Sequence, residues 1–373
     1  MGIRLDKPRK IVFLCGARDF HAIDWYRSAL KVSNDLEISI LTDLIAGEGF
    51  EKLITPDDSV EQLLILDNYL FRHQSSWGNK WRNLLKLLVM PIQIRRLKKH
   101  AKMHPHSIYW AHSMYYLFLA ESAGVSYIGT PQGSDILIKP YKSTWYRKRA
   151  IKALKAASYV TVDSVKMQDK IKDLAGIDAK IIQNGIDVKA INSAQQLLVD
   201  KERKWNISIR GITPLYRIKE LISARNKSIQ YGNEKLTLIY PFYEKVYKEE
   251  LEMMLVSEDK NLGRIDKSLF YQFFLQARII FSIPISDSSP KSVYEGIFSG
   301  AAVAVTYHPY YDLLPQVMKD RVILVDLEDE FWFEKAMTMT AVIMNTPFIP
   351  DDASLEMFDK DESFKKILKL INN

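Results

Sequence analysis

Short runs of β-branched and apolar residues alternate with helical patterns along this chain, and the alternation occurs twice. In the first half the strand-like runs lie at 10–14, 36–41, 63–66, 107–110, 125–128 and 159–162. In the second half they lie at 207–211, 236–240, 279–283, 302–305 and 322–325. Repetition of strand, helix and strand predicts parallel sheets with helices on both faces. We therefore expect an α/β protein built from two doubly wound parallel-sheet domains that face each other across a cleft.

The length of the chain supports two domains, because 373 residues exceed one ordinary domain. An Asn-Gly pair at 184–185 follows a strand-like run and leads into a polar stretch that ends near Arg203, which we interpret as the linker. The predicted domains are 1–190 and 205–345. The remaining residues, 346–373, are predicted to form a C-terminal helix that packs back on the first domain.

The composition excludes several classes of protein. Hydrophobic residues make up 47% of the chain and charged residues 26%, which are values of a globular protein rather than a disordered one. The single cysteine, Cys15, excludes a disulfide framework and fits a reducing cytoplasm. No apolar run reaches the length of a membrane span or has the form of a signal peptide, so we expect a soluble or peripheral protein.

The net charge of +7 is concentrated in one segment. From Asn68 to Ala120 there is no acidic residue, whereas the same stretch holds nine basic ones. The first of these is Arg72 and the last is Lys102, so the insertion is placed at about 72–102. The rest of the chain is nearly neutral.

Residues 77–90 of this segment predict an amphipathic helix. At about 100° per residue its tryptophan and leucine side chains fall on one face, with basic and amide side chains opposite. Pro91 is expected to break or kink the helix, and 92–102 is more basic still. Aromatic and leucine side chains beside clustered basic ones are typical of a helix that lies on an anionic membrane. The predicted contacts are Trp77, Lys80, Trp81, Arg82, Leu84, Leu85, Lys86, Leu88, Arg95, Arg96, Lys98 and Lys99.

Two other interpretations of the helix stay open. Its apolar face could enter the domain core, as in an ordinary surface helix. Nucleic acid is a third possible partner of the charge, but no nucleic-acid-binding motif accompanies the segment, and none is predicted.

The segment 286–296 carries the most chemical information. It follows a strand-like run and opens a helix, with Ser289 predicted at the N-cap and Pro290 at the first helical position. The unpaired backbone N–H groups and the positive end of the helix dipole suit phosphate. Glu295 lies about a turn and a half inside the helix, where it could accept from ribose hydroxyls, and Asp287 lies on the loop rim. The alternative is an ordinary capped helix.

This segment resembles the retaining glycosyltransferases of family 4, which have the GT-B fold of two Rossmann-like domains. That family has two acidic residues separated by seven others in this strand-loop-helix unit, and Asp287 and Glu295 have the same spacing, with Asp where the family usually has Glu. The resemblance implies that Glu295 binds the nucleotide ribose and that Asp287 contacts the donor sugar as the catalytic residue. The loop residues Ser288, Ser289, Lys291 and Ser292 are then expected to hold phosphate and sugar.

A second match lies in the first half. The succession from Thr130 to Asp135, followed by Asn184-Gly185, is similar to the family's N-terminal domain, with Gln132 where family members often have His. The residues expected on the acceptor side are Gly16, Arg18, Asp19, His112, Gly133, Ser134 and Asp135. For His112, a structural role is the alternative.

A third match begins the second domain. The family usually has an Arg and, a few residues later, a Lys that bind the donor diphosphate. Arg210 stands at the first position, but Tyr216 occupies the second. The second positive charge could come from Arg217, Lys219 or Arg264, and we predict Arg264.

The resemblance implies a metal-independent glycosyltransferase of the hexosyltransferase type that uses a UDP- or GDP-linked sugar and needs neither metal nor other cofactor. We expect a saccharide or lipid-linked acceptor, as in surface-polysaccharide or glycolipid synthesis, and a cytoplasmic enzyme on the inner face of the cell membrane. Two alternatives are a nucleotide-sugar epimerase of the same fold and a non-catalytic, membrane-associated sugar-binding protein.

Overall fold

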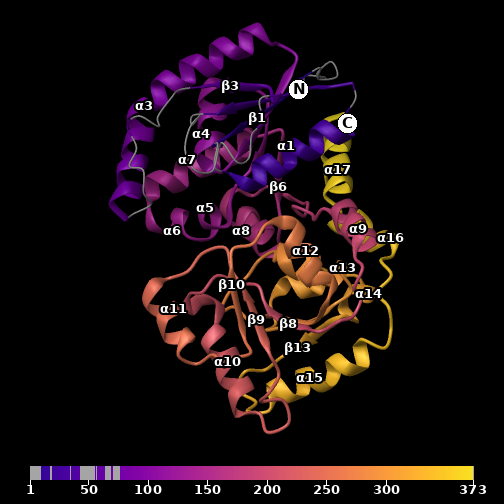
Figure 1. The fold of residues 1–373 in the computed structure, drawn as a ribbon. Coiled ribbons are helices and arrows are strands. Elements are labelled where there is room, and N and C mark those ends of the chain that lie inside the picture. The colour runs from indigo at the N-terminus through magenta and orange to yellow at the C-terminus, as the bar shows by residue number, and fades with distance from the viewer. Residues whose placement is uncertain are drawn as a thin grey trace. The chain divides into compact units, whose positions relative to one another are not determined.

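The computed structural model describes residues 10–16, 19–33, 35–42, 55, 57–63, 69 and 76–372. The chain forms two compact units, Met1–Asn184 with Lys360–Asn373, and Gly185–Asp359. Each unit is built around one parallel sheet with helices on both of its faces (Figure 1). The prediction of two doubly wound α/β domains is therefore confirmed.

The first sheet has seven strands in the order β3-β2-β1-β4-β5-β6-β7. In chain order the strands are β1 (Lys10–Cys15), β2 (Glu37–Thr42), β3 (Val60–Gln62), β4 (Ser107–His112), β5 (Tyr127–Thr130), β6 (Tyr159–Val162) and β7 (Lys180–Ile181). Every residue of β1 is buried, as expected of a central strand that is covered on both faces. Val12 and Leu14 enter the core on one face, while Ile11 and Phe13 enter the core on the other.

The helices of the first unit are α1 (Phe20–Val32), α3 (Ser76–Met103), α4 (Met114–Ala123), α5 (Gly133–Leu137), α6 (Lys139–Lys142), α7 (Thr144–Ala156), α8 (Val165–Ala175) and α17 (Lys360–Asn372). The C-terminal helix α17 packs beside α1 (Figure 1). Its Phe364 stacks on Trp110 of β4, with ring centres 5.9 Å apart. The last helix therefore completes one face of the first sheet.

The second sheet has six parallel strands in the order β10-β9-β8-β11-β12-β13. They are β8 (Trp205–Ser208), β9 (Leu236–Ile239), β10 (Lys260–Gly263), β11 (Ala277–Ser282), β12 (Ala302–Val305) and β13 (Val322–Leu324). The helices are α9 (Val188–Leu197), α10 (Ile218–Lys227), α11 (Lys245–Glu252), α12 (Lys267–Leu275), α13 (Lys291–Phe298), α14 (Gln316–Lys319), α15 (Trp332–Ile343) and α16 (Asp352–Phe358), with short 3₁₀ turns η2 (Pro214–Tyr216) and η3 (Pro309–Leu313).

Several predicted boundaries were wrong. The stretch interpreted as a linker contains α9, because Asp187 caps the helix through Ala190 N at 3.0 Å and because Val188 and Ile191 enter the second core. Strand β10 was missed because its sequence, KNLG, is polar and lies at a sheet edge. The predicted C-terminal helix is two helices, since Asp359 adopts an extended conformation between them. Residues 64–66 of the predicted third strand lie outside the described residues.

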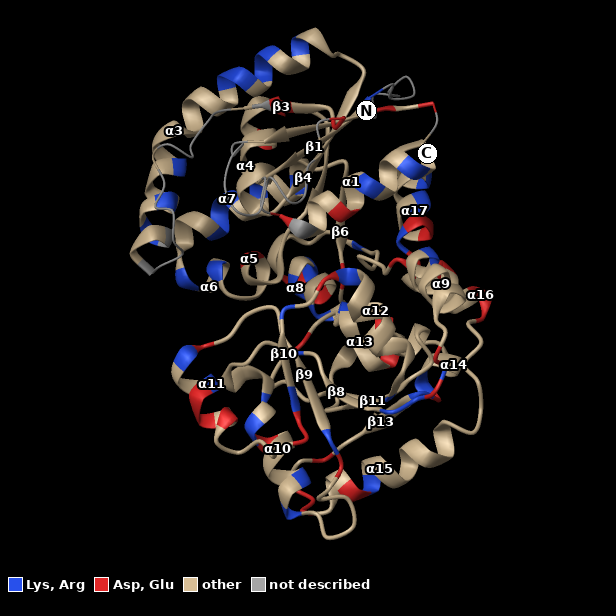
Figure 2. Cartoon of the chain, viewed as in Figure 1, with Lys and Arg blue, Asp and Glu red and all other residues tan. Residues whose placement is uncertain are grey.

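Helix α3 runs along the outside of the first unit and follows a curved path (Figure 1). It continues through Pro91, which therefore does not break it. Figure 2 shows Lys and Arg at intervals along α3 and no acidic residue on it, in agreement with its sequence. Among the described helices, none combines the length and the apolar character that crossing a membrane requires.

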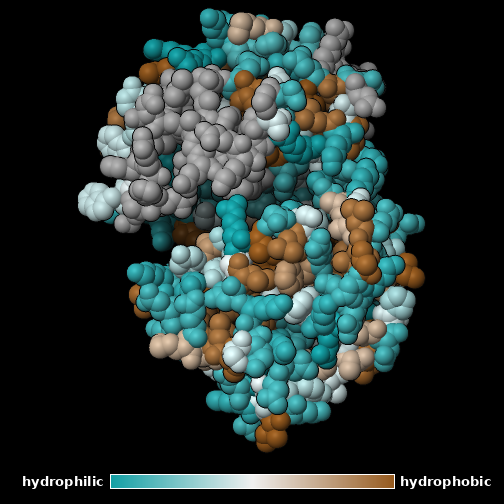
Figure 3. Space-filling model, viewed as in Figure 1, coloured by the Kyte–Doolittle hydropathy of each residue, from teal (hydrophilic) through white to brown (hydrophobic). Residues whose placement is uncertain are grey.

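The first six strands of the first sheet are arranged in the same order as the six strands of the second sheet. This order determines where a ligand can bind. In each sheet the chain builds outward to one side of the first strand and then returns to its other side, so a switch point lies between β1 and β4 and between β8 and β11. The loops at the carboxyl ends of such neighbouring strands diverge and leave room for a ligand. In the view of Figure 3 most described side chains on the surface are hydrophilic, with apolar ones in scattered patches.

Candidate functional site

A pocket of about 400 Å³ lies at the switch point of the second sheet. Arg210 closely follows β8 and Asp287 closely follows β11, so the strand order brings them together. The predicted donor residues that line the pocket are Arg210, Arg264, Asp287, Ser289, Lys291, Ser292 and Glu295. Ser288 does not line it, although its backbone N–H donates to Asp287 Oδ1 at 2.9 Å.

An ion pair connects the two strand ends. Arg210 Nη2 lies 2.5 Å from Asp287 Oδ2, and Arg210 Nε donates to Ser282 Oγ at 2.7 Å. Both charged side chains are largely buried, with exposed fractions of 13% and 16%. Burial, followed by the charge of Asp287, raises the pKa of Tyr310 well above its ordinary value, so this phenol stays protonated. The arginine fixes the position of the catalytic candidate Asp287 and neutralises its charge.

Glu295 occupies the second turn of α13 and is only 5% exposed. Its carboxylate accepts from Lys267 Nζ at 2.5 Å and from the Tyr271 hydroxyl at 3.4 Å. Because Lys267 is a solvent-exposed partner at the start of α12, it can leave Glu295 without disturbing the core. The carboxylate therefore has the burial and the position of an acceptor for hydroxyl groups.

The amino end of α13 contributes backbone groups to the pocket. The predicted cap is shifted by one residue, because Pro290 is the N-cap and Lys291 begins the helix. Ser289 is therefore not the N-cap residue, and the Pro290 side chain makes no capping hydrogen bond. Lys291 and Ser292 thus bring the amino end of α13, with the positive end of its helix dipole, to the pocket.

Sequence reasoning missed the apolar wall of this pocket. Tyr240, Phe242 and Phe270 line it, and Arg210 lies over the ring of Tyr216 at 5.7 Å. A Cβ at Gly211 would lie 2.4 Å from the Phe242 ring, so a larger residue there would require this ring to move. The signal available in the sequence was the position of Phe242, which follows a strand of the same sheet.

The predicted acceptor-side residues gather at the carboxyl end of the first sheet, but several have structural roles. Asp19 caps α1 by accepting from His21 N at 3.1 Å, and it also accepts from Gln132 Nε2 at 3.3 Å. Gly16 follows β1, Gly133 and Ser134 begin α5, and Arg18 lies outside the described residues. Asp135 is 3% exposed and accepts from the backbone N of Met114 at 2.8 Å.

His112 is buried rather than accessible, with an exposed fraction of 2%. It stacks on Phe13 and lies against Trp110, and its Nε2 has no hydrogen-bond partner among the described residues. Burial lowers the pKa of His112 to about 4, so the ring is neutral at pH 7. A direct contact with an acceptor is therefore not supported by its position.

The apolar face of α3 does not enter the core. Trp77, Leu84 and Leu88 are 76%, 49% and 64% exposed. The side facing the unit instead buries Gln93 and Leu97. The core-helix interpretation is therefore wrong for this face. Of the other predicted contacts, Lys80, Trp81, Arg95, Arg96, Lys98 and Lys99 are exposed, Arg82, Leu85 and Lys86 are partly buried, and Arg72 lies outside the described residues.

One group in the described part of the chain has the residue types of a metal site. The ligand atoms of Glu61, His100 and His104 lie within 4.8 Å of one another. Lys10 Nζ already neutralises Glu61, at 3.2 Å from its Oε1, and His100 contacts the hydroxyl of Tyr109 at 2.6 Å. Burial lowers the pKa of His100. An ammonium ion beside the carboxylate disfavours a second cation, so this group does not support a metal-dependent function.

No protein-family model matches the sequence, and no curated protein matches it. Solved structures do resemble it. The structure of Anabaena HepE with UDP has a TM-score of 0.67 at 16% identity, over 96% of this chain and 98% of that one. Sucrose-phosphate synthase of Thermosynechococcus elongatus has a TM-score of 0.67 at 11% identity, over 97% of this chain and 98% of that one. The UDP-forming α,α-trehalose-phosphate synthase of Burkholderia xenovorans has a TM-score of 0.67 at 13% identity, over 98% of this chain and 99% of that one. The chain therefore has the GT-B fold of these glycosyltransferases.

Proposed function

We propose that the chain is a glycosyltransferase that binds a nucleoside-diphosphate sugar in the pocket of the second unit. The observation that carries this proposal is the meeting of Arg210, Asp287 and Glu295 at the switch point of one sheet. A buried carboxylate suits ribose hydroxyls, while arginine and the amino end of a helix suit a diphosphate. That HepE has been crystallised with UDP and with UDP-glucose gives further support.

In this proposal each residue has a defined task. Glu295 accepts hydrogen bonds from the ribose, Arg210 and Arg264 bind the diphosphate, and Asp287 contacts the sugar. As the bond between the sugar C1 and the diphosphate oxygen breaks, negative charge grows on the diphosphate. The two guanidinium groups and the amino end of α13 stabilise that charge. The acceptor oxygen forms the new bond to C1, and its proton goes to the leaving diphosphate.

The finer assignments extend the proposal. They comprise a retaining, family 4-like reaction, transfer of a hexose without a metal ion, and a saccharide or lipid-linked acceptor used in surface-polysaccharide or glycolipid synthesis. A protein attached to the inner face of the cell membrane through α3 is consistent with the exposed tryptophan and leucine side chains beside basic ones. Unchanged turnover in the presence of EDTA would support metal independence.

Calorimetric titration with UDP-glucose, GDP-mannose and the free nucleotides tests donor binding. Product analysis then separates the candidate activities. A transferase releases nucleoside diphosphate in step with the glycosylated acceptor, whereas an epimerase converts the donor without acceptor. Failure of every nucleotide sugar to bind would contradict the proposal, and binding without turnover toward any acceptor would favour a sugar-binding protein.

A further inference from the structure

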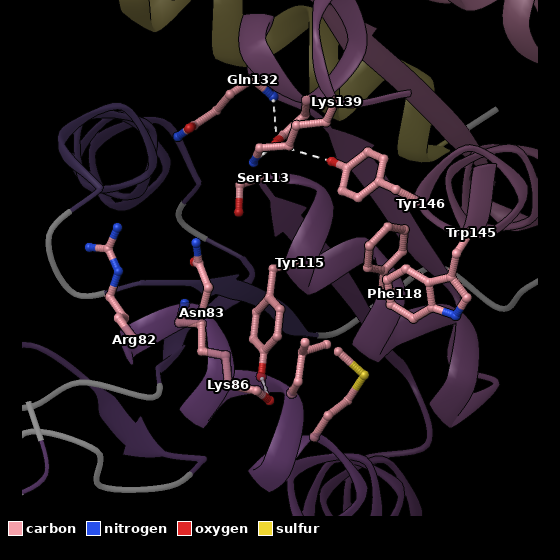
Figure 4. Close-up of a pocket in the computed structure, with 13 residues that line it drawn as sticks. Arg82, Asn83, Lys86, Ser113, Tyr115, Phe118, Gln132, Lys139, Trp145 and Tyr146 are labelled. Carbon is pink, nitrogen blue, oxygen red and sulfur yellow. Dashed lines mark hydrogen bonds and ion pairs between the residues drawn. The ribbon is translucent and has the colours of Figure 1, made fainter. Parts of the chain in front are cut away.

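A second pocket, which we call the α3 pocket, lies within the first unit and has a volume of about 360 Å³. Its walls come from α3, α4, α5, α6 and α7, and from Ser113 and Gln132 beyond the ends of β4 and β5. Figure 4 shows Arg82, Asn83 and Lys86 on one side of it and Phe118, Trp145 and Tyr146 on the other. Basic and aromatic side chains therefore face the same space.

The charge of the α3 pocket is positive. Its single lining acid, Asp135, pairs with Lys139 Nζ at 2.6 Å and also accepts from Tyr146 at 3.3 Å. The other basic side chains of the lining are Arg82 and Lys86. Arg82 is half-buried, and within the described ranges no acidic side chain forms an ion pair with it. Lys86 lies 4.4 Å from the ring centre of Tyr115 and donates to the Tyr116 hydroxyl at 3.3 Å. A ligand that completes this site is an anion.

The apolar part of the lining continues onto the outside of α3. Leu87 and Met90 line the α3 pocket, and Leu87 is also 49% exposed. On a helix Leu87 neighbours Leu84, three residues before it, and Leu84 neighbours Leu88, four residues after it. Both of these leucines are exposed. An apolar chain that leaves the pocket past Leu87 therefore reaches a line of exposed apolar side chains.

We propose that the α3 pocket binds the phosphoryl group of a lipid phosphate, with the lipid chain passing over Leu87 onto the outer face of α3. Arg82 and Lys86 bind the anion, and the surrounding aromatic side chains exclude water from it. The identification of this lipid phosphate as an acceptor rests on the proposed function. The binding site itself depends only on the residues that line the pocket.

Titration of the full chain with farnesyl phosphate, below the concentration at which it forms micelles, tests the assignment. Farnesol carries the chain without the anion, and inorganic phosphate carries the anion without the chain. We expect each of these two probes to bind at least about tenfold more weakly than farnesyl phosphate, because each loses one of the two kinds of contact. Equal affinity for farnesol would overturn the anion site, and equal affinity for inorganic phosphate would overturn the lipid assignment.

Matched variants localise the binding. Arg82→Gln is expected to raise the Kd for farnesyl phosphate by about tenfold. Arg147→Gln makes the same change of charge on α7, at an exposed residue that does not line the pocket, and is expected to leave the Kd within about twofold. Leu87→Gln is expected to weaken binding about fivefold, while Leu197→Gln, at an exposed leucine of the second unit, has little effect. Equal losses within either pair would contradict the site.

Two controls make each outcome decisive. Thermal melts identify any variant that loses affinity through unfolding, and the conservative Arg82→Lys variant is then expected to retain most of the affinity. UDP-glucose titration of the same samples separates the two proposals. Donor binding without farnesyl phosphate binding refutes the α3 pocket alone, whereas farnesyl phosphate binding without donor binding refutes the glycosyltransferase proposal and leaves a lipid-phosphate site.

Discussion

Arg210 and Asp287 are 77 positions apart in the chain, yet Nη2 of the arginine lies 2.5 Å from Oδ2 of the aspartate. The contact exists because β8 and β11 are neighbours in the sheet although β9 and β10 separate them in sequence. It joins the predicted diphosphate-binding residue to the predicted sugar-binding residue. Arg210 also donates to Ser282 Oγ, so it keeps a partner when Asp287 loses its charge. The first prediction concerns that substitution.

We expect Asp287→Asn to lower kcat by at least about tenfold, because the contact with the sugar and the partner of Arg210 are both lost. The Kd for UDP should change less than about threefold, since the nucleotide does not need this carboxylate. Steady-state kinetics and calorimetry measure the two quantities. Asp320→Asn, at an exposed position on the same unit, controls for the loss of a carboxylate. An equal loss of UDP affinity would refute the assignment of Asp287 to the sugar.

Glu295→Gln should weaken nucleotide binding by about 1–3 kcal/mol, because a charge-assisted hydrogen bond to the ribose is lost. Calorimetry with UDP measures this effect, and Glu249→Gln on α11 is the exposed control. Lys267→Gln removes the observed partner of Glu295 but keeps its carboxylate. If Lys267→Gln weakens binding as much as Glu295→Gln does, the ion pair rather than the ribose contact determines affinity.

Replacing Trp77 and Leu88 together with Ser should release the protein from phosphatidylglycerol vesicles. Both side chains are more than half exposed, so the free energy of unfolding should change by no more than about 0.5 kcal/mol per site. Sedimentation with vesicles and urea unfolding provide the two measurements. Leu197→Ser, at an 81% exposed leucine of the second unit, is the matched control. Vesicle binding that survives the double substitution would exclude α3 as the attachment site.

The basic residues of α3 lead to a separate prediction. Lys98→Gln with Lys99→Gln should weaken binding to anionic vesicles by about 1 kcal/mol per lysine, and added salt should reduce the difference from the parent protein. Vesicles of phosphatidylcholine alone should bind poorly. Binding that is insensitive to both salt and lipid charge would show that electrostatic attraction does not contribute.

His112 should make the first unit sensitive to acid. In the unfolded chain its pKa is about 6.5, whereas burial holds the pKa at about 4 in the folded unit. The unfolded state therefore binds the proton first, and the stabilisation from the neutral ring is present above pH 6.5 and lost as the pH falls toward 4. The loss between pH 7 and pH 4.5 should be about 2–3 kcal/mol.

Urea unfolding at the two pH values measures this contribution, with His112→Phe as the variant that cannot be protonated. The phenyl ring keeps the stacking position between Phe13 and Trp110. Between pH 7 and pH 4.5 the variant should lose about 2–3 kcal/mol less stability than the parent protein. The same dependence in both proteins would mean that other groups cause the acid sensitivity.

Local patterns in the sequence were sufficient for most of the fold. The apolar runs at 10–14, 159–162 and 302–305 form strands as expected, because a buried parallel strand needs little beyond such a run. Elements were missed where the local composition does not show which residues are buried. The edge strand β10 is polar, and α9 was hidden within a polar stretch although it buries Val188 and Ile191.

The sequence by itself determined the two α/β units and the loop with Asp287 and Glu295 eight positions apart, because strands, helix starts and loop spacing depend on neighbouring residues. Only the tertiary structure decided that Arg210 pairs with Asp287 and that the tryptophan and leucine face of α3 points away from its unit. Hydropathy identifies an apolar helix face but not what covers it. Strand order and helix packing depend on contacts between residues distant in sequence, and those contacts determine which charges meet and which apolar side chains remain exposed.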